Sequence, residues 1–264
     1  MGAGDPKKKS TVPVRARPDS PAGGGGPGHF RDADSFRADE KRWDTVRHAK
    51  APAGRLEVAT AADAASGAVK KSKAPKTKPF TKQIASQSGS EITLDVRVQV
   101  LADTMNDDTV ERPSSADTRY ETSPGLNEFA SASYKTMDGK ITAFTKKLVV
   151  RGSYIIRTHY RPGASPNDDS EYGRGTTPTD KASGNVTLGF HESCHRDEYV
   201  DYLTSKPYPK FTGKVGMTEE QFSTAVDEFA DAVKAFNAGL DALGPAVDEV
   251  GDCPKADWET GKCP

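Results

Sequence analysis

The sequence contains no long hydrophobic run and no large excess of charge of either sign. A helix that spans a bilayer needs about 20 consecutive apolar residues, and no stretch of this chain approaches that length. The basic residues Lys7, Lys8 and Lys9 are not followed by the apolar segment of a signal peptide. The formal net charge of -1 gives no overall field that favours nucleic acid or an anionic membrane. We therefore expect a soluble protein with no membrane partner, either cytoplasmic or exported by a route that needs no signal peptide.

Apolar residues are also scarce. They make up 34% of the chain, which has 24 glycines, 18 prolines and a mean hydropathy of -0.70, so we expect only part of it to fold. Residues 1–85 are predicted to be a disordered low-complexity extension, with one candidate for a short helix at 34–49. The basic stretch at 70–78 indicates a solvated linker rather than a nucleic-acid-binding segment. We expect the extension to serve as an address for secretion or delivery machinery.

Cysteine and histidine are rare too, with three and five copies. Three cysteines neither demand nor exclude an oxidising compartment. A disulfide between Cys253 and Cys263 would close the C-terminal tail at 253–264, and free thiols are the alternative. Two of the five histidines, in contrast, lie four residues apart in a single motif.

That motif is H-E-S-C-H at residues 191–195, an instance of H-E-x-x-H. Residues four apart lie on the same face of a helix, so the imidazoles of His191 and His195 can bind one metal ion. Glu192 then lies beside a zinc-bound water and can take its proton, as a zinc peptidase requires. The alternation at 186–190 predicts a strand that leads into this helix. The alternative interpretation is a surface helix with two solvated histidines.

A catalytic zinc ion takes three protein ligands and keeps an open position, so a third side chain is needed. We choose Asp248, which lies on a short segment after a long predicted helix. The choice is open, because several other side chains are chemically able to act as ligands. These are Glu219, Glu220, Glu249, His159, Cys194 and Cys253.

Most of these alternatives have another explanation. The acidic pair at 219–220 opens a capped helix, where the helix dipole accounts for it. Cys194 would point away from the face that the two histidines share. His159 is interpreted as structural on a strand. Either His159 or Tyr199 is expected to stabilise the oxyanion, on residue type alone.

The remaining pattern predicts an α+β fold. The alternation from Glu91 to Leu101 is typical of a strand with one wet face. Further strands are expected at 118–122, 134–137, 140–144, 148–150 and 154–156. The Asp138-Gly139 pair predicts a type I′ hairpin turn, whereas 151–153 is either a second turn or a bulge in one long strand. Besides the H-E-x-x-H helix, a short helix is expected from Ser123-Pro124 and a long one at 218–243 with a capping box. A surface loop at 161–183 would form one wall of a substrate cleft.

This order of segments, with H-E-S-C-H-R-D-E-Y at its centre, resembles the uncharacterised bacterial family of predicted secreted zinc-dependent proteases, which are zincin-like. The resemblance covers residues 90–252 and rests mainly on the H-E-x-x-H motif. In that family a Y-D-x-x-T-x-H-G motif closes the domain. This chain has Val247-Asp248 and then Gly251-Asp252-Cys253, so the aspartate matches but the Tyr, Thr and His do not. The resemblance implies a metallopeptidase fold.

We expect residues 86–252 to form a zincin-like metallopeptidase domain. Its small mixed or antiparallel sheet would pack on the H-E-x-x-H helix and the second long helix. The expected function is hydrolysis of a peptide or protein substrate, with Zn²⁺ held by His191, His195 and Asp248 and with Glu192 as general base on the zinc-bound water. The alternative is a non-catalytic zinc-binding or interaction protein, including a cargo or effector of a secretion system. Nucleic acid is not expected as a partner.

Overall fold

The computed structural model describes residues 9–10, 69–127 and 130–263. These residues belong to one compact unit of the chain. The candidate helix at 34–49 and most of the expected extension at 1–85 lie outside the described residues. The delivery role expected of that extension therefore stays a prediction.

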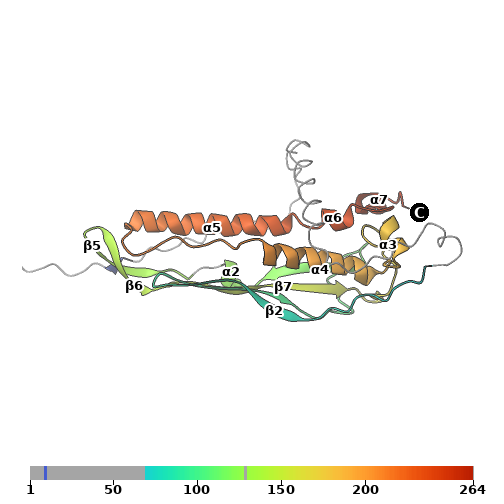
Figure 1. Ribbon diagram of the computed structural model, residues 1–264, viewed down its shortest axis with the longest axis horizontal. Coiled ribbons are helices and arrows are strands. Elements are labelled where there is room, and N and C mark those ends of the chain that lie inside the picture. The colour runs from blue at the N-terminus through green and yellow to red at the C-terminus, as the bar shows by residue number, and fades with distance from the viewer. Residues whose placement is uncertain (1–8, 11–68, 128–129, 264) are drawn as a thin grey trace, which may run out of the picture. The chain divides into compact units, whose positions relative to one another are not determined.

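The main sheet has four strands in the order β2-β3-β7-β4 (Figure 1). The central strands β3 and β7 are parallel, and each outer strand is antiparallel to its neighbour. The expected mixed sheet in an α+β fold is confirmed. The strands are β2 (Phe80–Ser88), β3 (Ile92–Val100), β4 (Ala116–Thr122) and β7 (Leu148–Tyr160).

The sequence predicted the central strand β3 correctly and the central strand β7 only in part. Strand β3 buries each alternate residue from Ile92 to Val100, as its alternation predicted. Strand β7 is continuous through 151–153 and keeps its register with β3, so neither the turn nor the bulge expected there is present. Gly152 permits this course, because an added Cβ would lie 2.3 Å from Ser123 Oγ and 2.7 Å from Leu126 Cγ. The short helix α2 (Pro124–Asn127) thus packs directly on β7.

A second, three-stranded sheet has the order β1-β5-β6. The Asp138-Gly139 turn joins β5 to β6, and both turn residues have positive φ, +53° and +73°. This is the backbone that a type I′ hairpin requires, so that prediction is confirmed. The strands are β1 (Lys9–Ser10), β5 (Ser133–Met137) and β6 (Lys140–Lys146).

Two long helices, α4 (Leu188–Ser205) and α5 (Glu219–Asp241), lie on the same side of the main sheet (Figure 1). The predicted capping box of α5 is confirmed: Thr218 Oγ1 accepts from the Gln221 backbone N–H at 3.2 Å, and Gln221 Oε1 accepts from the Thr218 N–H at 3.0 Å. The stripe that α5 buries against the sheet consists of Phe222, Ala225, Val226, Phe229, Val233, Phe236 and Leu240.

The strand expected at 186–190 is wrong. Thr187 is the N-cap of α4, and its side chain accepts a hydrogen bond from the Phe190 backbone N–H at 3.1 Å. Leu188 and Phe190 therefore belong to the first turn of the helix. Apolar residues two apart are typical of a strand, but one turn of a helix also contains residues two apart. The apolar alternation at 186–190 was therefore wrongly interpreted as a strand.

The boundary expected at residue 85/86 is also wrong, since the compact unit includes the chain from Val69 onward. Strand β2 begins at Phe80, and Ser72 N–H already donates to Gly184 O at 2.8 Å. Strand β2 lies at the edge of the sheet and is mostly polar and exposed. It therefore lacks the hydrophobic alternation by which β3 was found.

Candidate metal centre

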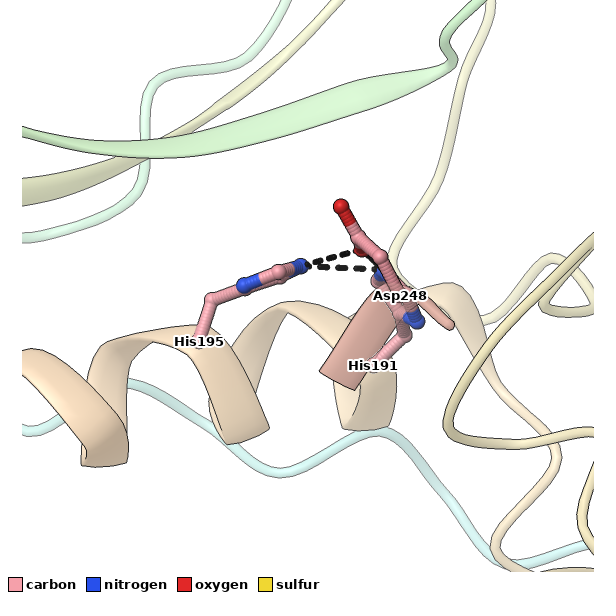
Figure 2. A group of neighbouring side chains, drawn as sticks. All are labelled: His191, His195 and Asp248. Carbon is pink, nitrogen blue, oxygen red and sulfur yellow. Dashed lines mark hydrogen bonds and ion pairs between the residues drawn. The ribbon is translucent and has the colours of Figure 1, made fainter. Parts of the chain in front are cut away.

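Helix α4 brings the two motif histidines to one face. His191 and His195 are one helical turn apart, and their ring centroids are separated by 4.9 Å. His195 Nε2 lies 3.2 Å from His191 Nε2, so the same nitrogen of each ring faces one point in space. Figure 2 shows Asp248 at that point, with dashed contacts from His195 to both partners.

Asp248 reaches the histidines from the short helix α6 (Pro245–Asp248). Gly244, with a φ of +116°, turns the chain after α5, and Pro245 starts α6. Asp248 Oδ1 lies 2.9 Å from His195 Nε2 and 3.4 Å from His191 Nε2. Within the described residues, this is the group whose ligating atoms, all within 4.8 Å of one another, could hold a metal ion. The structure thus brings together the three ligands chosen from the sequence.

The spacing of these atoms fits zinc. A tetrahedral zinc ion with bonds of about 2.0–2.1 Å places its ligand atoms roughly 3.3 Å apart. The three observed separations, 3.2, 2.9 and 3.4 Å, bracket that value. Two imidazole nitrogens and one carboxylate oxygen are also a donor set that suits zinc.

The other nitrogen of His191 determines which tautomer the ring adopts. His191 Nδ1 lies 3.0 Å from the backbone carbonyl oxygen of Arg174. A carbonyl only accepts hydrogen bonds, so Nδ1 carries the proton and donates it, which leaves the Nε2 lone pair for a metal. The Arg174 N–H donates in turn to Val247 O at 2.8 Å, next to Asp248. One short segment therefore links both sides of the candidate site.

That segment is held by an ion pair between the half-buried Arg174 and the buried Asp180. Arg174 Nε and Nη2 donate to the two oxygens of Asp180 at 2.9 and 2.8 Å, and the Gly175 N–H donates to the same carboxylate at 2.9 Å. Burial alone would raise the pKa of Asp180, but these hydrogen bonds lower it to about 2. The expectation that 161–183 is simply a surface loop is therefore wrong, because Asp180 lies buried in the helix α3 (Pro178–Ala182).

Close backbone approach explains why a glycine precedes Arg174. Gly173 has a φ of +61°, and a Cβ at this position would lie 2.3 Å from Val247 O. The neighbouring Tyr172 packs edge-on against the His191 ring, with centroids 5.0 Å apart, and it also packs against Trp258, with centroids 4.8 Å apart. The contact with Tyr172 therefore restricts the orientation of the His191 ring.

Glu192 is buried beside the histidines, with 2% of its surface exposed. Its Oε2 has no hydrogen-bond partner among the described residues. Burial raises the pKa of the Glu192 carboxyl, and the nearby His191 and His195 oppose that shift. A buried carboxylate oxygen without a partner is costly, so it indicates a ligand or a proton transfer at this position.

Asp248 makes a second ion pair with its other oxygen. Lys255 Nζ lies 3.1 Å from Asp248 Oδ2, whereas Oδ1 faces the histidines. Burial would raise the pKa of Asp248, but the hydrogen bonds from His191 and His195 hold it well below its usual range. For His195, burial lowers the pKa, and the bond to Asp248 with the charge of Glu192 raises it overall.

A cleft of about 380 Å³ opens onto the three residues Glu192, His195 and Asp248. One side is formed by residues 116–119 of β4, the last strand of the sheet. The predicted wall from the 161–183 segment is present, because Tyr172 lines the cleft. Other lining residues include Thr109, Val110, Tyr199, Leu243, Gly244 and Lys255.

The remaining ligand candidates lie outside the cluster. His159 Nδ1 pairs with Asp107 Oδ2 at 2.6 Å and lines a different cavity of about 140 Å³. Cys194 is half-buried, and burial raises the pKa of its thiol to about 11. Cys253 is joined to Cys263 in a disulfide, which settles that open alternative. Glutamates 219 and 220 lie in the first turn of α5, and the residue after Asp248 is not part of the group.

Sequence reasoning missed Tyr172, Arg174 and Lys255. Arg174 acts through its backbone carbonyl, which no residue pattern reveals. Lys255 lay in the C-terminal tail that had been set apart from the domain. The sequence signal that could have indicated Lys255 was its short distance from Asp248 along the chain.

Comparisons with known proteins add nothing to this picture. No family model, no curated protein and no solved structure matches the chain. Among the described residues, no helix has both the length and the apolar character that crossing a membrane requires.

Proposed function

We propose that this protein is a zinc-dependent peptidase. One observation carries the proposal: the ligating atoms of His191, His195 and Asp248 converge at a cleft that is also lined by Glu192, whose Oε2 has no hydrogen-bond partner among the described residues. Ligands alone would suit a structural metal site. A buried base that faces the same space adds the second component that hydrolysis needs.

Each residue then has a distinct role. Bound zinc would supply Lewis acidity, which lowers the pKa of a water molecule and polarises a substrate carbonyl. Glu192 takes the proton of the attacking water and then donates it to the leaving amine. His191, His195 and Asp248 hold the ion, and the Arg174 carbonyl keeps the His191 ring in the tautomer that binds it.

Tyr199 is the candidate for the residue that stabilises the oxyanion. It follows His195 by one helical turn and lines the cleft, whereas His159 does not. The ring of Tyr120 packs edge-on against it at 5.4 Å and holds its orientation. Burial raises the pKa of the Tyr199 phenol to about 12, so it keeps its proton and can donate it in a hydrogen bond.

The position of β4 favours a polypeptide substrate. This strand ends the sheet order and its residues 116–119 line the cleft. An outer strand offers backbone N–H and C=O groups to which an extended peptide can add as a further strand. A peptide bound in this way would run past Glu192.

The alternative, a zinc-binding protein without turnover, is less well supported. Structural zinc sites are closed by four protein ligands, whereas catalytic sites keep one position open. In the described part of the chain three side chains converge, and a cleft leads to them. The geometry therefore favours a catalytic site.

Metal analysis and a casein-digestion assay test the proposal together. The wild-type protein should bind one zinc ion, and His191→Ala and His195→Ala should lose it. Glu192→Gln should keep zinc while the rate of digestion falls by a few orders of magnitude, because the substitution removes the base and not a ligand. Zinc binding with equal digestion by wild type and Glu192→Gln would exclude the proposed mechanism. Zinc binding without any digestion by the wild type would favour the non-catalytic alternative.

A further inference from the structure

The two carboxylate oxygens of Asp248 contact different partners. Oδ1 lies 2.9 Å from His195 Nε2, and Oδ2 lies 3.1 Å from Lys255 Nζ. A carboxylate bonded at both oxygens cannot rotate about its Cβ–Cγ bond without breaking one contact. Lys255 therefore restricts the orientation of the Asp248 carboxylate and keeps one of its oxygens toward the histidines.

Lys255 is itself held in place. Its Nζ lies 5.5 Å from the ring centroid of Tyr172, over the same ring that packs against His191. A cation over an aromatic face is attracted to it, so Tyr172 supports Lys255 and His191 at once. One third of the Lys255 side chain is exposed to solvent. Burial alone therefore does not force its ammonium group into contact with Asp248.

The segment that carries Lys255 is fastened to the domain. We call residues 249–263 the C-terminal arm, and it contains α7 (Lys255–Glu259). The disulfide between Cys253 and Cys263 closes most of the arm into a loop. Cys253 O accepts from the Gly173 N–H at 2.8 Å, and Trp258 packs on Tyr172 at 4.8 Å. The arm therefore contacts the same segment that orients His191.

We propose that Lys255 is a positioning residue of the metal centre, and that the C-terminal arm belongs to the site. The proposal rests on the proposed function, because it assumes that Asp248 binds zinc. Lys255 acts through Asp248: by binding one carboxylate oxygen, it restricts rotation of the group and keeps the other oxygen facing the ion. Partners that orient a ligand in this way commonly contribute tenfold to hundredfold in metal affinity.

The charge of Lys255 alone would have the opposite effect. A cation repels a nearby metal ion, so removal of the charge by itself would strengthen zinc binding. Loss of the hydrogen bond would weaken it, because Asp248 would become free to rotate. The sign of the change in affinity thus distinguishes a positioning residue from a charge that is merely close.

The test is zinc affinity of the full-length protein, measured by competition with a chelator. Lys255→Met should weaken zinc binding about tenfold or more, and Lys255→Arg, which keeps a charged donor, should restore most of it. Lys262→Met is the matched control, since Lys262 is an exposed residue of the same arm that pairs with Asp257 at 3.1 Å. It should bind zinc like the wild type. Lys255→Ala replaces Lys255→Met if the latter does not fold.

Cobalt provides a second readout that does not depend on activity. The visible spectrum of Co²⁺ reports the arrangement of its ligands, so Lys255→Met should change it and Lys262→Met should not. Equal or tighter zinc binding by Lys255→Met overturns the proposal, and so does a failure of Lys255→Arg to restore affinity. If the wild type binds no zinc, the proposed function fails and this proposal fails with it.

Discussion

Asp248 Oδ1 lies 2.9 Å from His195 Nε2, although 53 residues separate them in the sequence. The chain between them forms the second half of α4, a connecting segment and the whole of α5, and it returns through Gly244. Gly244 N–H donates to Glu198 Oε2 at 3.2 Å, which ties the start of α6 to α4 one turn after His195. The contact is therefore built by the packing of two helices and does not arise from chance proximity of side chains.

Removal of the Tyr199 hydroxyl should reduce catalysis and leave zinc binding intact. Tyr199→Phe keeps the ring that packs on Tyr120 and removes the proposed donor to the oxyanion. The loss of one such donor typically costs about a hundredfold or more in kcat. The rate of casein digestion and the zinc content of the same preparation are the measurements.

Tyr202→Phe is the control for that variant. The Tyr202 hydroxyl donates to Phe236 O at 2.9 Å and does not line the cleft, so its loss should lower stability by about 1 kcal/mol and leave the rate unchanged. Equal rates for Tyr199→Phe and the wild type would remove Tyr199 from the mechanism.

Substitution of Gly173 should weaken the metal centre through the backbone. In Gly173→Ala the added Cβ would meet Val247 O at 2.3 Å, so the segment before Asp248 must move. Zinc affinity should fall, and the free energy of unfolding should drop by roughly 2–4 kcal/mol. Calorimetric zinc titration and urea unfolding measure the two effects.

Gly163→Ala is the control that separates the cost of backbone strain from the effect of displaced neighbouring atoms. Gly163 has a φ of +84°, but a Cβ there would meet no atom within 4 Å. The control should therefore lose only about 1 kcal/mol to backbone strain and bind zinc normally. If both variants bind zinc equally well, the close contact between Gly173 and Val247 does not support the site.

Asp180 should make stability depend on pH in the acid range. Its pKa is about 2 in the folded protein, below the ordinary value of 3.8. A depressed folded pKa contributes stability that is fully present above the unfolded pKa and is lost as pH falls from about 4 to 2. The contribution is on the order of 2 kcal/mol.

Asp180→Asn should therefore be less stable than the wild type at pH 7, and the difference should shrink between pH 4 and pH 2. Urea unfolding over that range measures it. Asp231→Asn, at an exposed position of α5, is the control for the loss of one negative charge. A difference between wild type and Asp180→Asn that stays constant with pH would contradict the role of the ion pair with Arg174.

Loss of the disulfide should weaken zinc binding. The bond between Cys253 and Cys263 limits the freedom of the C-terminal arm, and without it Lys255 is held by fewer contacts. A Cys253→Ser/Cys263→Ser double variant should bind zinc several-fold more weakly than the wild type in chelator competition. Cys194→Ser removes the free thiol and should not change the affinity. A double variant with wild-type affinity would show that the arm does not need its cross-link.

Local features of this protein were predictable from sequence, and non-local ones were not. The spacing of His191 and His195, the alternation of β3 and the capping box at Thr218 each depend on neighbours along the chain. Strand β2 was missed because its residues are polar at a sheet edge. Thr187 was a signal for the start of α4, since threonine is a preferred N-cap, yet the alternation after it was given more weight.

The site shows the same limit. Asp248 was chosen by chain order and by resemblance to a family motif, and no pattern linked it to the histidines. The partners that orient the ligands, the Arg174 carbonyl and Lys255, depend on how loops pack against α4 and α6. Such contacts depend on tertiary structure, so residue type and spacing along the chain did not predict them.

The most direct test of the account is the zinc content and zinc affinity of the wild-type protein beside Asp248→Ala. The account predicts one zinc ion per wild-type chain and a loss of affinity of at least a hundredfold in Asp248→Ala, because the site would keep only the two imidazoles. Asp252→Asn, an exposed carboxylate four residues later that pairs with Lys181, should match the wild type. A wild-type protein without zinc, or an Asp248→Ala variant that binds it equally well, would contradict the central claim.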